Sequence, residues 1–290
     1  MDNILVIDVG GTKTNVSIVS SLTQNVKDVK INSSKLFPTP SNPEHFIQKV
    51  LSLPDISLIN TEIVSLSLPG KWSNEGILKE SFYLHEWLNY PLIENLRKEL
   101  KVKKCIWETD VICGALGEYY ASGVEHDKSM LYINLGTGIG AAFIKDGKPF
   151  KSNFAPTLRL QKLVFPYNEE LYSGVDLISG GALLTVSEYD SVKVLFENYK
   201  KGEVGAMDII SKAQIQLASW IINLFYLFAP DLIVLNGGLT NDWEVLCEEA
   251  IELANEELDN AVQILPTRLK ELAPIYGAYF NYVNQTTSNV

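Results

Sequence analysis

Three glycine-rich turns, each directly after a short apolar segment, restrict the fold of this chain more than any other feature. The apolar segments span residues 4–7, 130–135 and 232–235, and each is followed closely by paired or alternating glycines. After the first two turns a second apolar segment begins at once, at Asn15 and at Ala141. Too few residues intervene for a crossover helix, so strand, turn and strand are expected to form an antiparallel hairpin twice in the chain.

Helices and further strands surround these hairpins. The residue pattern predicts helices at 44–51, 91–100, 204–228, 243–257 and 276–282, strands at 63–68 and 104–107, and a tight turn at 146–147. Residues 151–181 show no clear period. The alternation predicts an α/β fold with two domains of similar plan facing a cleft. We expect a smaller domain at 1–110, with a C-terminal helix near 279–290 packed back on it, and a larger domain at 111–278.

Length and charge narrow the function classes. At roughly 150 residues per domain, 290 residues agree with two domains. The chain has 24 Lys and Arg against 35 Asp and Glu, a formal net charge of −11, which argues against nucleic acid because phosphate backbones are bound by basic residues. No basic signal-peptide region precedes the first apolar segment, and the uncharged stretch 213–230 fits a buried amphipathic helix better than a membrane span. A cytoplasmic protein without membrane or nucleic-acid partners is expected.

Cysteine and histidine are too few and too scattered for a metal or disulfide framework. The chain has 3 of each and no Cys-x-x-Cys pair. This spacing matches neither the ligand sets of structural zinc nor a disulfide scaffold. A reducing compartment and no zinc are therefore expected.

The first glycine turn is a candidate phosphate site. Asp8 ends the first strand, and Gly10, Gly11, Thr12, Lys13 and Thr14 follow it. Glycines let backbone amides come close to an anion, threonine hydroxyls add donors, and an aspartate at a strand end can hold Mg²⁺ through water. Lys13 either neutralises a phosphate or points to solvent. The structural alternative is a tight hairpin that needs only one glycine, and the Walker A spacing is absent.

Two further glycine turns extend the candidate site. Gly136, Thr137 and Gly138 form a second phosphate candidate, and the β-type segment after them speaks against a dinucleotide fingerprint, which needs a helix there. Gly237 and Gly238 precede a helix whose N-terminus can face a nucleotide, although such a pair is often only a turn.

Asp110 stands between a strand and a helix, where the strand end meets the predicted crevice. A carboxylate within reach of an acceptor hydroxyl can take its proton during phosphoryl transfer. The alternative is a plain helix N-cap. The two roles agree only in part, because a carboxylate that accepts backbone hydrogen bonds has a lowered pKa and is a weaker base.

The chain resembles the ROK family of sugar kinases, in which the segments DVGGTKT, LPG, EWLNYPL, ETDVICGALGEYYASG, INLGTGIGAAF, LYSG, LIVLNGG and YGAYF occur in this order. The resemblance implies a two-domain actin/hexokinase-like (ribonuclease H-like) fold with a nucleotide cleft between the domains. It also implies ATP-dependent phosphorylation of a hexose or hexose derivative, with Mg²⁺ accompanying ATP. Residues 8–14 and 136–140 would then hold the phosphates, and Gly237 and Gly238 would line the adenosine pocket.

The resemblance also implies an acceptor site, where this chain departs from the family pattern. Acceptor-binding positions fall on Gly70, Thr109, Asp110 and Glu169, with Asp110 as the catalytic base. Glu170 is the one-residue alternative to Glu169. Many family members have Asn where Thr109 stands, and many have a His and a Cys-rich zinc site in the middle section, whereas residues 151–170 contain neither His nor Cys.

Three functions stay open at this point. A sugar kinase accounts for the order of the motifs, and the altered acceptor site leaves room for a catalytically silent sugar-binding sensor or for a phosphotransferase that acts on a non-sugar acceptor. Family repressors carry a DNA-binding helix-turn-helix before the first glycine motif, and no such segment is expected before Asp8. The sugar, its phosphorylated hydroxyl and the oligomeric state, including a homodimer, stay open.

Overall fold

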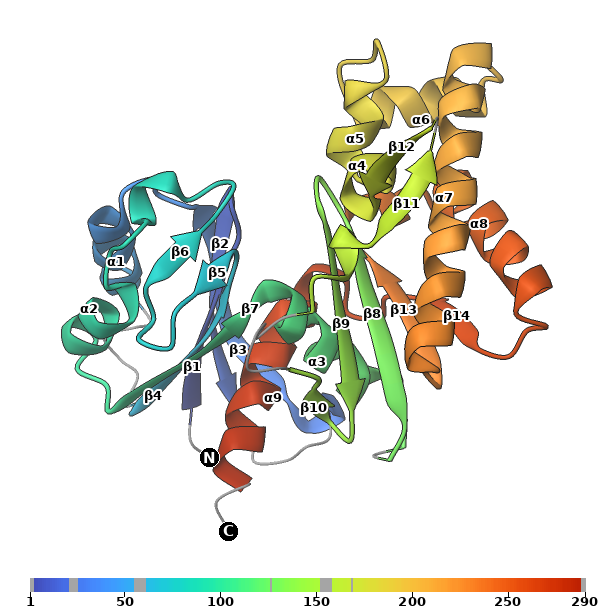
Figure 1. Ribbon diagram of the computed structural model, residues 1–290. Coiled ribbons are helices and arrows are strands. Elements are labelled where there is room, and N and C mark those ends of the chain that lie inside the picture. The colour runs from blue at the N-terminus through green and yellow to red at the C-terminus, as the bar shows by residue number, and fades with distance from the viewer. Residues whose placement is uncertain are drawn as a thin grey trace. The chain divides into compact units, whose positions relative to one another are not determined.

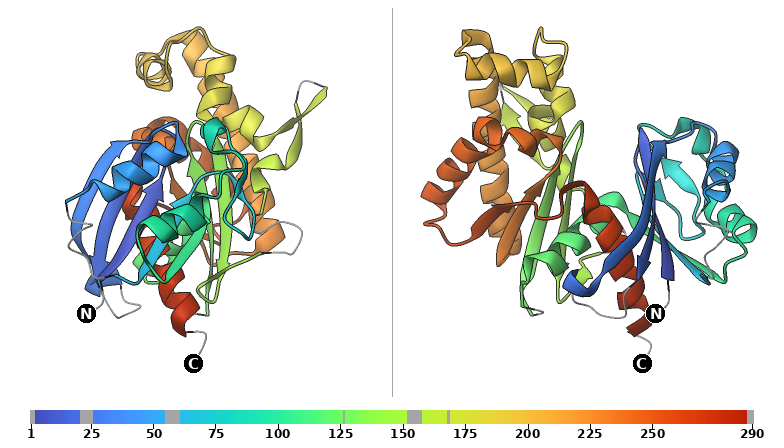
Figure 2. Two further views of the ribbon diagram at one scale, coloured as in Figure 1. Left: turned by 90° about the vertical axis from the view of Figure 1, so that its left-hand side faces the viewer. Right: turned by 180° about the vertical axis from the view of Figure 1, so that it is seen from behind.

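The computed structural model of the chain consists of two compact units, each built around a five-stranded sheet (Figures 1 and 2). Unit 1 comprises residues 1–123 and 271–290, and unit 2 comprises residues 124–270. The structure describes residues 3–20, 26–54, 61–125, 127–151, 158–167 and 169–287. The boundary expected after residue 110 falls inside unit 1, because the helix that begins there is part of this unit.

The sheet of unit 1 has the strand order β3-β2-β1-β4-β7. Its strands are β1 (Asn3–Val9), β2 (Lys13–Ser20), β3 (Lys30–Pro38), β4 (Ile63–Leu68) and β7 (Lys104–Thr109). β1 and β2 form the first predicted hairpin, with Val9 opposite Thr14, which confirms that prediction. β4 and β7 run parallel to β1, so these three strands end at the same edge of the sheet.

Helices cover both faces of this sheet. α1 (Pro43–Leu51) and α2 (Leu92–Glu99) pack on one face, and α3 (Asp110–Ser122) and α9 (Ala273–Thr287) on the other (Figure 1). Successive residues of β1 alternate between the two cores: Leu5 and Ile7 contact the first helix pair, and Ile4 and Val6 the second. The strand is therefore apolar on both faces, as expected for a sheet between helix layers.

Two glycines let α3 and α9 approach each other backbone to backbone. A Cβ at Gly277 would lie 1.6 Å from the carbonyl oxygen of Cys113, and one at Gly117 would lie 2.2 Å from that of Ala273. No larger residue fits at either position without moving a helix. The closing helix predicted at 276–282 is thus longer than expected and forms part of the core of unit 1.

Unit 2 repeats the plan with the strand order β10-β9-β8-β13-β14. Its strands are β8 (Ser129–Leu135), β9 (Ile139–Lys145), β10 (Lys148–Pro149), β13 (Leu232–Asn236) and β14 (Gln263–Pro266). β8 and β9 form the second predicted hairpin, and β13 lies parallel to β8. α7 (Val204–Phe228) and α8 (Trp243–Glu257) begin and end where the sequence pattern predicts and pack on the core of unit 2.

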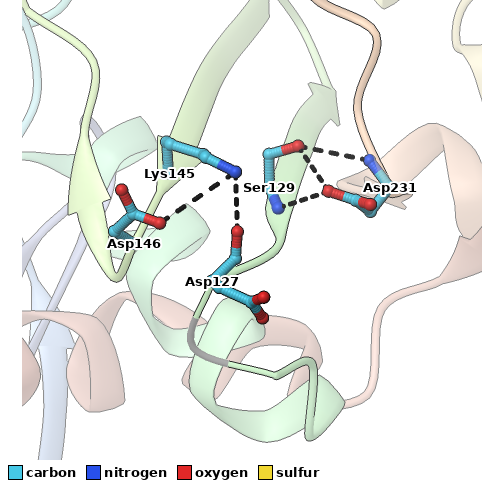
Figure 3. Close-up of polar contacts among 5 residues, drawn as sticks. All are labelled: Asp127, Ser129, Lys145, Asp146 and Asp231. Atoms are coloured by element: carbon cyan, nitrogen blue, oxygen red, sulfur yellow. Dashed lines mark hydrogen bonds and ion pairs between the residues drawn. The ribbon is translucent and has the colours of Figure 1, made fainter.

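A polar cluster fastens the amino-terminal ends of β8 and β13 to each other (Figure 3). The carboxylate of Asp231 accepts hydrogen bonds from the backbone nitrogen of Ser129 at 2.7 Å and from its hydroxyl at 2.8 Å. Lys145 of β9 donates to the carbonyl oxygen of Asp127 at 2.6 Å. This cluster fixes the register of β8 and β13 at the end of the sheet opposite their glycine turns.

The described part of the section without a clear period forms a separate hairpin, and short helices follow it. β11 (Val164–Tyr167) and β12 (Glu170–Ser173) pair in antiparallel fashion, followed by α4 (Gly174–Ile178), α5 (Gly180–Thr185) and α6 (Val192–Lys200). In unit 1, β5 (Lys71–Trp72) and β6 (Leu78–Glu80) form another short hairpin. None of the helices in the described ranges has the length and apolar character that a membrane crossing requires.

Candidate functional site

The candidate site of unit 1 is the edge where β1, β4 and β7 end. Asp8, Ser67 and Glu108 are register partners across the three parallel strands and form a row on one face of the sheet. Thr109 and Asp110 follow at the end of β7 and the start of α3. Polar side chains at the carboxyl ends of parallel strands are the usual location of a ligand site in α/β folds. The structure thus brings Asp8 and Asp110 to the same edge.

Asp8 is a half-buried carboxylate with an unusual pKa. Burial raises the pKa of Asp8 from 3.8 to about 7, the Ser67 hydroxyl lowers it, and the charge of Asp110 raises it. Ser67 itself is fully buried, and its hydroxyl makes no well-formed hydrogen bond with any of the described residues. A buried hydroxyl of this kind needs an explanation, and its position beside Asp8 at the strand ends makes it available to a ligand there.

Asp110 occupies the first turn of α3, and the structure corrects the N-cap predicted there. The cap is Thr109, whose hydroxyl accepts a hydrogen bond from the Ile112 nitrogen at 3.4 Å. Asp110 accepts one from the Val111 nitrogen at 2.9 Å through Oδ1. Thr and Asp are both good caps, so sequence alone ranks them poorly.

The pKa of Asp110 also departs from its ordinary value. Burial raises it from 3.8 to about 6, although the backbone hydrogen bonds act in the opposite direction. A general base functions best when its pKa lies near the working pH. The hydrogen bonds at the helix start therefore do not lower the pKa of Asp110 below its ordinary value, because desolvation outweighs them here.

The first glycine turn is held in a fixed shape by its own backbone and by Thr39. The Gly10 nitrogen donates to the Lys13 carbonyl at 2.8 Å, and the Thr39 hydroxyl donates to the Gly10 carbonyl at 2.8 Å. Thr14 is fully buried, and its hydroxyl oxygen lies 2.9 Å from that of Thr39. It therefore stabilises the turn through Thr39. Thr12 and Lys13 are exposed, and Gly10 and Gly11 are half-buried.

Gly70 lies in the turn after β4, next to β7 at the same edge. Its φ is +92°, a conformation that favours glycine, and a Cβ there would lie 2.4 Å from the Glu80 carbonyl oxygen. Since Leu68 pairs with Thr109, the structure places Gly70 near the strand end that carries Thr109 and Asp110.

The glycine turn of unit 2 is joined to the start of α5. The Gly180 nitrogen donates to the Gly136 carbonyl at 2.8 Å, and the Gly181 nitrogen donates to the Thr137 carbonyl at 3.0 Å. Thr137 and Gly138 are exposed, and a Cβ at Gly138 would meet no atom within 4 Å. The Gly136 and Thr137 carbonyls of this turn are therefore bound by the start of α5, while Thr137 and Gly138 remain accessible to a ligand.

Gly237 lies against the same turn. Its φ is +104°, and a Cβ there would lie 2.2 Å from the carbonyl oxygen of Leu135, the last residue of β8. Gly238 is exposed, and a Cβ at this position would meet nothing within 4 Å. The second and third glycine turns are thus neighbours at the carboxyl edge of the sheet of unit 2.

The two candidate glutamates lie at the tip of the β11–β12 hairpin of unit 2. Glu169 has a φ of +65° in the turn, and Glu170 accepts a hydrogen bond from the Tyr172 hydroxyl at 2.8 Å. Both are exposed. Within the described ranges no three or more His, Cys, Asp or Glu side chains are grouped as a metal site would require. Residues 152–157 and 168 of the expected zinc-free section lie outside those ranges.

Sequence reasoning missed several residues of these sites. Ser67 and Glu108 are buried polar positions in strands that otherwise read as apolar, and this contrast was the available signal. The Ser179-Gly180-Gly181 segment, a cap followed by two glycines, could have indicated the helix start that meets the second turn.

Comparisons with known proteins agree with this architecture. A model of the ROK family matches residues 4–155 and 176–283. An uncharacterised protein of Clostridium perfringens is 28% identical over 96% of both chains. An N-acetyl-D-glucosamine kinase of Pectobacterium atrosepticum is 25% identical over 92% of this chain and 89% of that protein.

Solved structures share the whole fold at low identity. A ROK family protein from Streptococcus pneumoniae in complex with sucrose has a TM-score of 0.84 at 20% identity, covering 99% of both chains. A ROK family glucokinase from Streptomyces griseus in complex with glucose and AMPPNP has a TM-score of 0.71 at 18% identity, covering 95% of this chain and 97% of that one. A ROK family transcriptional regulator, a homolog of the E. coli MLC protein, has a TM-score of 0.77 at 14% identity, covering 99% and 81%.

These matches extend over nearly the whole chain, and the fold is the two-domain actin/hexokinase-like α/β fold. The family match covers both glycine hairpins, β4, β7, the segment around Asp110 and most of α9. The chain therefore belongs to the ROK family.

Proposed function

We propose that this protein transfers the γ-phosphate of ATP to a hydroxyl of a monosaccharide, a hexose or hexose derivative, with Asp110 as the general base. The observation that carries the proposal is Asp110 itself. It lies where three parallel strands, β1, β4 and β7, have their carboxyl ends, and burial raises its pKa to about 6. Its Oδ1 accepts a hydrogen bond from the Val111 nitrogen at 2.9 Å, which orients the carboxylate.

In the proposed reaction, the acceptor hydroxyl oxygen forms a bond to the γ-phosphorus while the bond to the β–γ bridging oxygen breaks and ADP leaves. The hydroxyl proton passes to Oδ2 of Asp110. The Thr109 hydroxyl oxygen accepts a hydrogen bond from the Ile112 nitrogen, so its hydrogen can be donated to an oxygen of the sugar. Gly70 and Glu169, with Glu170 as the alternative, are proposed to complete the acceptor site.

The nucleotide is proposed to bind through the three glycine turns. The phosphates would be held by the first turn, with Gly10, Gly11, Thr12 and Lys13 and with Thr14 supporting them, and by the second turn, with Gly136, Thr137 and Gly138. The adenosine pocket would be lined by Gly237 and Gly238. Two of these turns are adjacent in unit 2, which supports a shared ligand.

The residues at the edge of unit 1 fit a magnesium ion bound with ATP. Mg²⁺ in phosphoryl-transfer sites binds one or two carboxylates together with waters and phosphate oxygens, and Asp8 would supply a carboxylate of this kind. Burial raises the pKa of Asp8, and a cation beside it would favour its ionised form. When bound, Mg²⁺ neutralises charge on the β- and γ-phosphates.

Kinetics of Asp110→Asn with a panel of hexoses, hexosamines and N-acetylhexosamines test the proposal. We expect ADP release that depends on one of these sugars, and a kcat about 10²- to 10⁴-fold lower in the variant with nearly unchanged ATP affinity. Sugar binding without phosphorylation would favour a silent sensor, and sugar-independent phosphorylation of another acceptor would favour a different phosphotransferase. A variant with near-normal turnover would remove Asp110 from the mechanism.

A further inference from the structure

An aromatic side chain lies directly on the first glycine turn. A Cβ at Gly11 would come within 2.5 Å of Cγ, 2.6 Å of Cδ2 and 2.8 Å of Cβ of Tyr83. The α-carbon of Gly11 is therefore covered by the root of the Tyr83 ring. Tyr83 belongs to unit 1, as does the turn, and 52% of its surface remains exposed.

The two glycines of this turn are needed for different reasons. At Gly10 an added Cβ would meet the Lys13 carbonyl oxygen at 2.8 Å, which is backbone of the turn itself. At Gly11 the three nearest atoms all belong to the side chain of Tyr83, and the backbone of Gly11 does not have a positive φ. Alanine at Gly11 is thus excluded by Tyr83 and not by the turn.

The segment that carries Tyr83 also contacts the turn at Gly70. A Cβ at Gly70 would lie 2.4 Å from the Glu80 carbonyl oxygen and 3.3 Å from Cβ of Ser81. The Ser81 hydroxyl accepts hydrogen bonds from the backbone nitrogens of Tyr83 at 3.2 Å and Leu84 at 3.1 Å, which fixes the segment in a turn. Residues 80–84 therefore touch both the phosphate turn and the turn assigned to the acceptor.

We propose that Tyr83 is a positioning residue for the nucleotide: its ring packs on Gly11, holds the 10–13 turn in its phosphate-binding shape and links it to the Gly70 turn. This inference rests on the proposed function, in which that turn binds ATP phosphates. The ring acts through its carbon atoms, since those nearest Gly11 are at its root. The neighbouring Phe82 is 88% exposed and is not among the atoms nearest Gly11, so it serves as a matched control.

Kinetics and calorimetric AMPPNP binding of single variants test the positioning role. Tyr83→Ala should raise the KM for MgATP and the Kd for AMPPNP about fivefold, as expected for one lost aromatic contact, while kcat changes less than twofold. Tyr83→Phe should retain the wild-type Kd, and Phe82→Ala should leave the KM for MgATP and the Kd for AMPPNP unchanged. A lower Kd in Tyr83→Ala, which would make the ring an obstruction, overturns the proposal, and so does an equal effect of Phe82→Ala.

A double-mutant cycle gives a second measurement that does not depend on turnover. Gly11→Ala should weaken AMPPNP binding about tenfold. Because Tyr83→Ala removes the clash, the double variant should bind only about fivefold more weakly than the wild type, as Tyr83→Ala alone does, and not the roughly fiftyfold expected of independent effects. Gly10→Ala should not be rescued, since its obstacle is backbone. Should Tyr83→Ala not fold, Tyr83→Leu takes its place in the cycle. Failure of rescue at Gly11, or equal rescue at Gly10, overturns the proposal.

The outcomes separate this proposal from the proposed function. Wild-type protein that binds AMPPNP but phosphorylates no acceptor contradicts the kinase function, and the binding cycle still decides the role of Tyr83. Wild-type protein that binds no nucleotide contradicts both. Kinase activity with no coupling between Gly11 and Tyr83 contradicts only the role of Tyr83.

Discussion

Ser67 of β4 pairs with Asp8 of β1 across two parallel strands, and its buried hydroxyl lowers the pKa of a carboxylate that burial raises. The two effects together leave the pKa of Asp8 at about 7. The ionisation of Asp8 therefore depends first on its burial and second on the Ser67 hydroxyl, which also lowers the pKa of Cys113.

Removing that hydroxyl should shift the pH dependence of nucleotide use. In Ser67→Ala, the pKa of Asp8 rises above about 7, so kcat/KM for MgATP should reach its plateau about one pH unit higher than in the wild type. Ser65→Ala is the control, because Ser65 pairs with Val6 and donates to the Ala278 carbonyl at 2.6 Å. Identical profiles for Ser67→Ala and wild type would disconnect Ser67 from Asp8.

The turnover number should report the ionisation of Asp110. A base must be deprotonated to accept a proton, so kcat should rise with pH through about 6 and level off above it. The measurement is kcat at saturating MgATP and acceptor from pH 4.5 to pH 9. A kcat that is flat across this range would argue against a titrating base.

Asp110→Asn should be more stable than the wild type at high pH. The pKa of Asp110 is about 6 in the folded state and 3.8 ordinarily, so the folded state favours the protonated carboxyl group. Its contribution to the free energy of unfolding is therefore present at low pH and is lost as the pH rises through about 6. The variant should gain about 1–3 kcal/mol in free energy of unfolding at pH 8 and little at pH 4.

Urea unfolding at the two pH values measures this difference. Asp208→Asn provides a control, because Asp208 forms an exposed pair with Lys212 at 2.7 Å and such pairs contribute little. If Asp110→Asn were less stable than the wild type at pH 8, the ionised Asp110 carboxylate would stabilise the folded state, which contradicts this prediction.

Gly237 and Gly238 should respond differently to alanine. Gly237→Ala forces a φ of +104° on a residue with a Cβ that would lie 2.2 Å from the Leu135 carbonyl, so we expect a loss of about 1–3 kcal/mol or more in stability. Gly238→Ala has open space and should stay within about 0.5 kcal/mol of the wild type while weakening nucleotide binding. Thermal unfolding and AMPPNP titration distinguish them, and equal stability losses would contradict the assignment.

Thr109→Asn should sharpen the preference for glucose-type sugars. Asparagine also caps helices, so α3 should begin at the same residue. Its side-chain amide can both donate and accept a hydrogen bond with the sugar. One net hydrogen bond corresponds to about 1 kcal/mol, or roughly fivefold in kcat/KM between epimers. Thr109→Ser, which keeps only the hydroxyl, is the control. Wild-type enzyme that already rejects every epimer but glucose by several orders of magnitude would contradict this prediction.

The parts of the fold with strong periodicity could be predicted from the sequence. Both hairpins, α7 and α8 follow directly from runs of apolar residues bounded by glycine or polar turns. The β11–β12 hairpin could not, because its strands are short and its side chains largely exposed, so burial imposes no alternation on them.

The candidate site was predictable to a different degree. Asp8 and Asp110 stand at strand ends, which the sequence pattern locates. The choice of Thr109 as cap, the raised pKa of Asp110 and the contact of Tyr83 with Gly11 depend on tertiary packing. Seventy-odd residues of chain between Gly11 and Tyr83 leave no local signal of their contact.

The membership of α9 in unit 1 bears on how the chain folds during synthesis. Unit 2 is continuous from residue 124 to residue 270, so all of its strands are synthesised before α9. Until then the core of unit 1 lacks Ile275, Tyr279 and Phe280, and the Ser65 hydroxyl lacks the Ala278 carbonyl to which it donates. Residues 1–123 thus complete the second of their two cores only after unit 2 has been synthesised, which departs from the usual N-terminal-first order of domain folding.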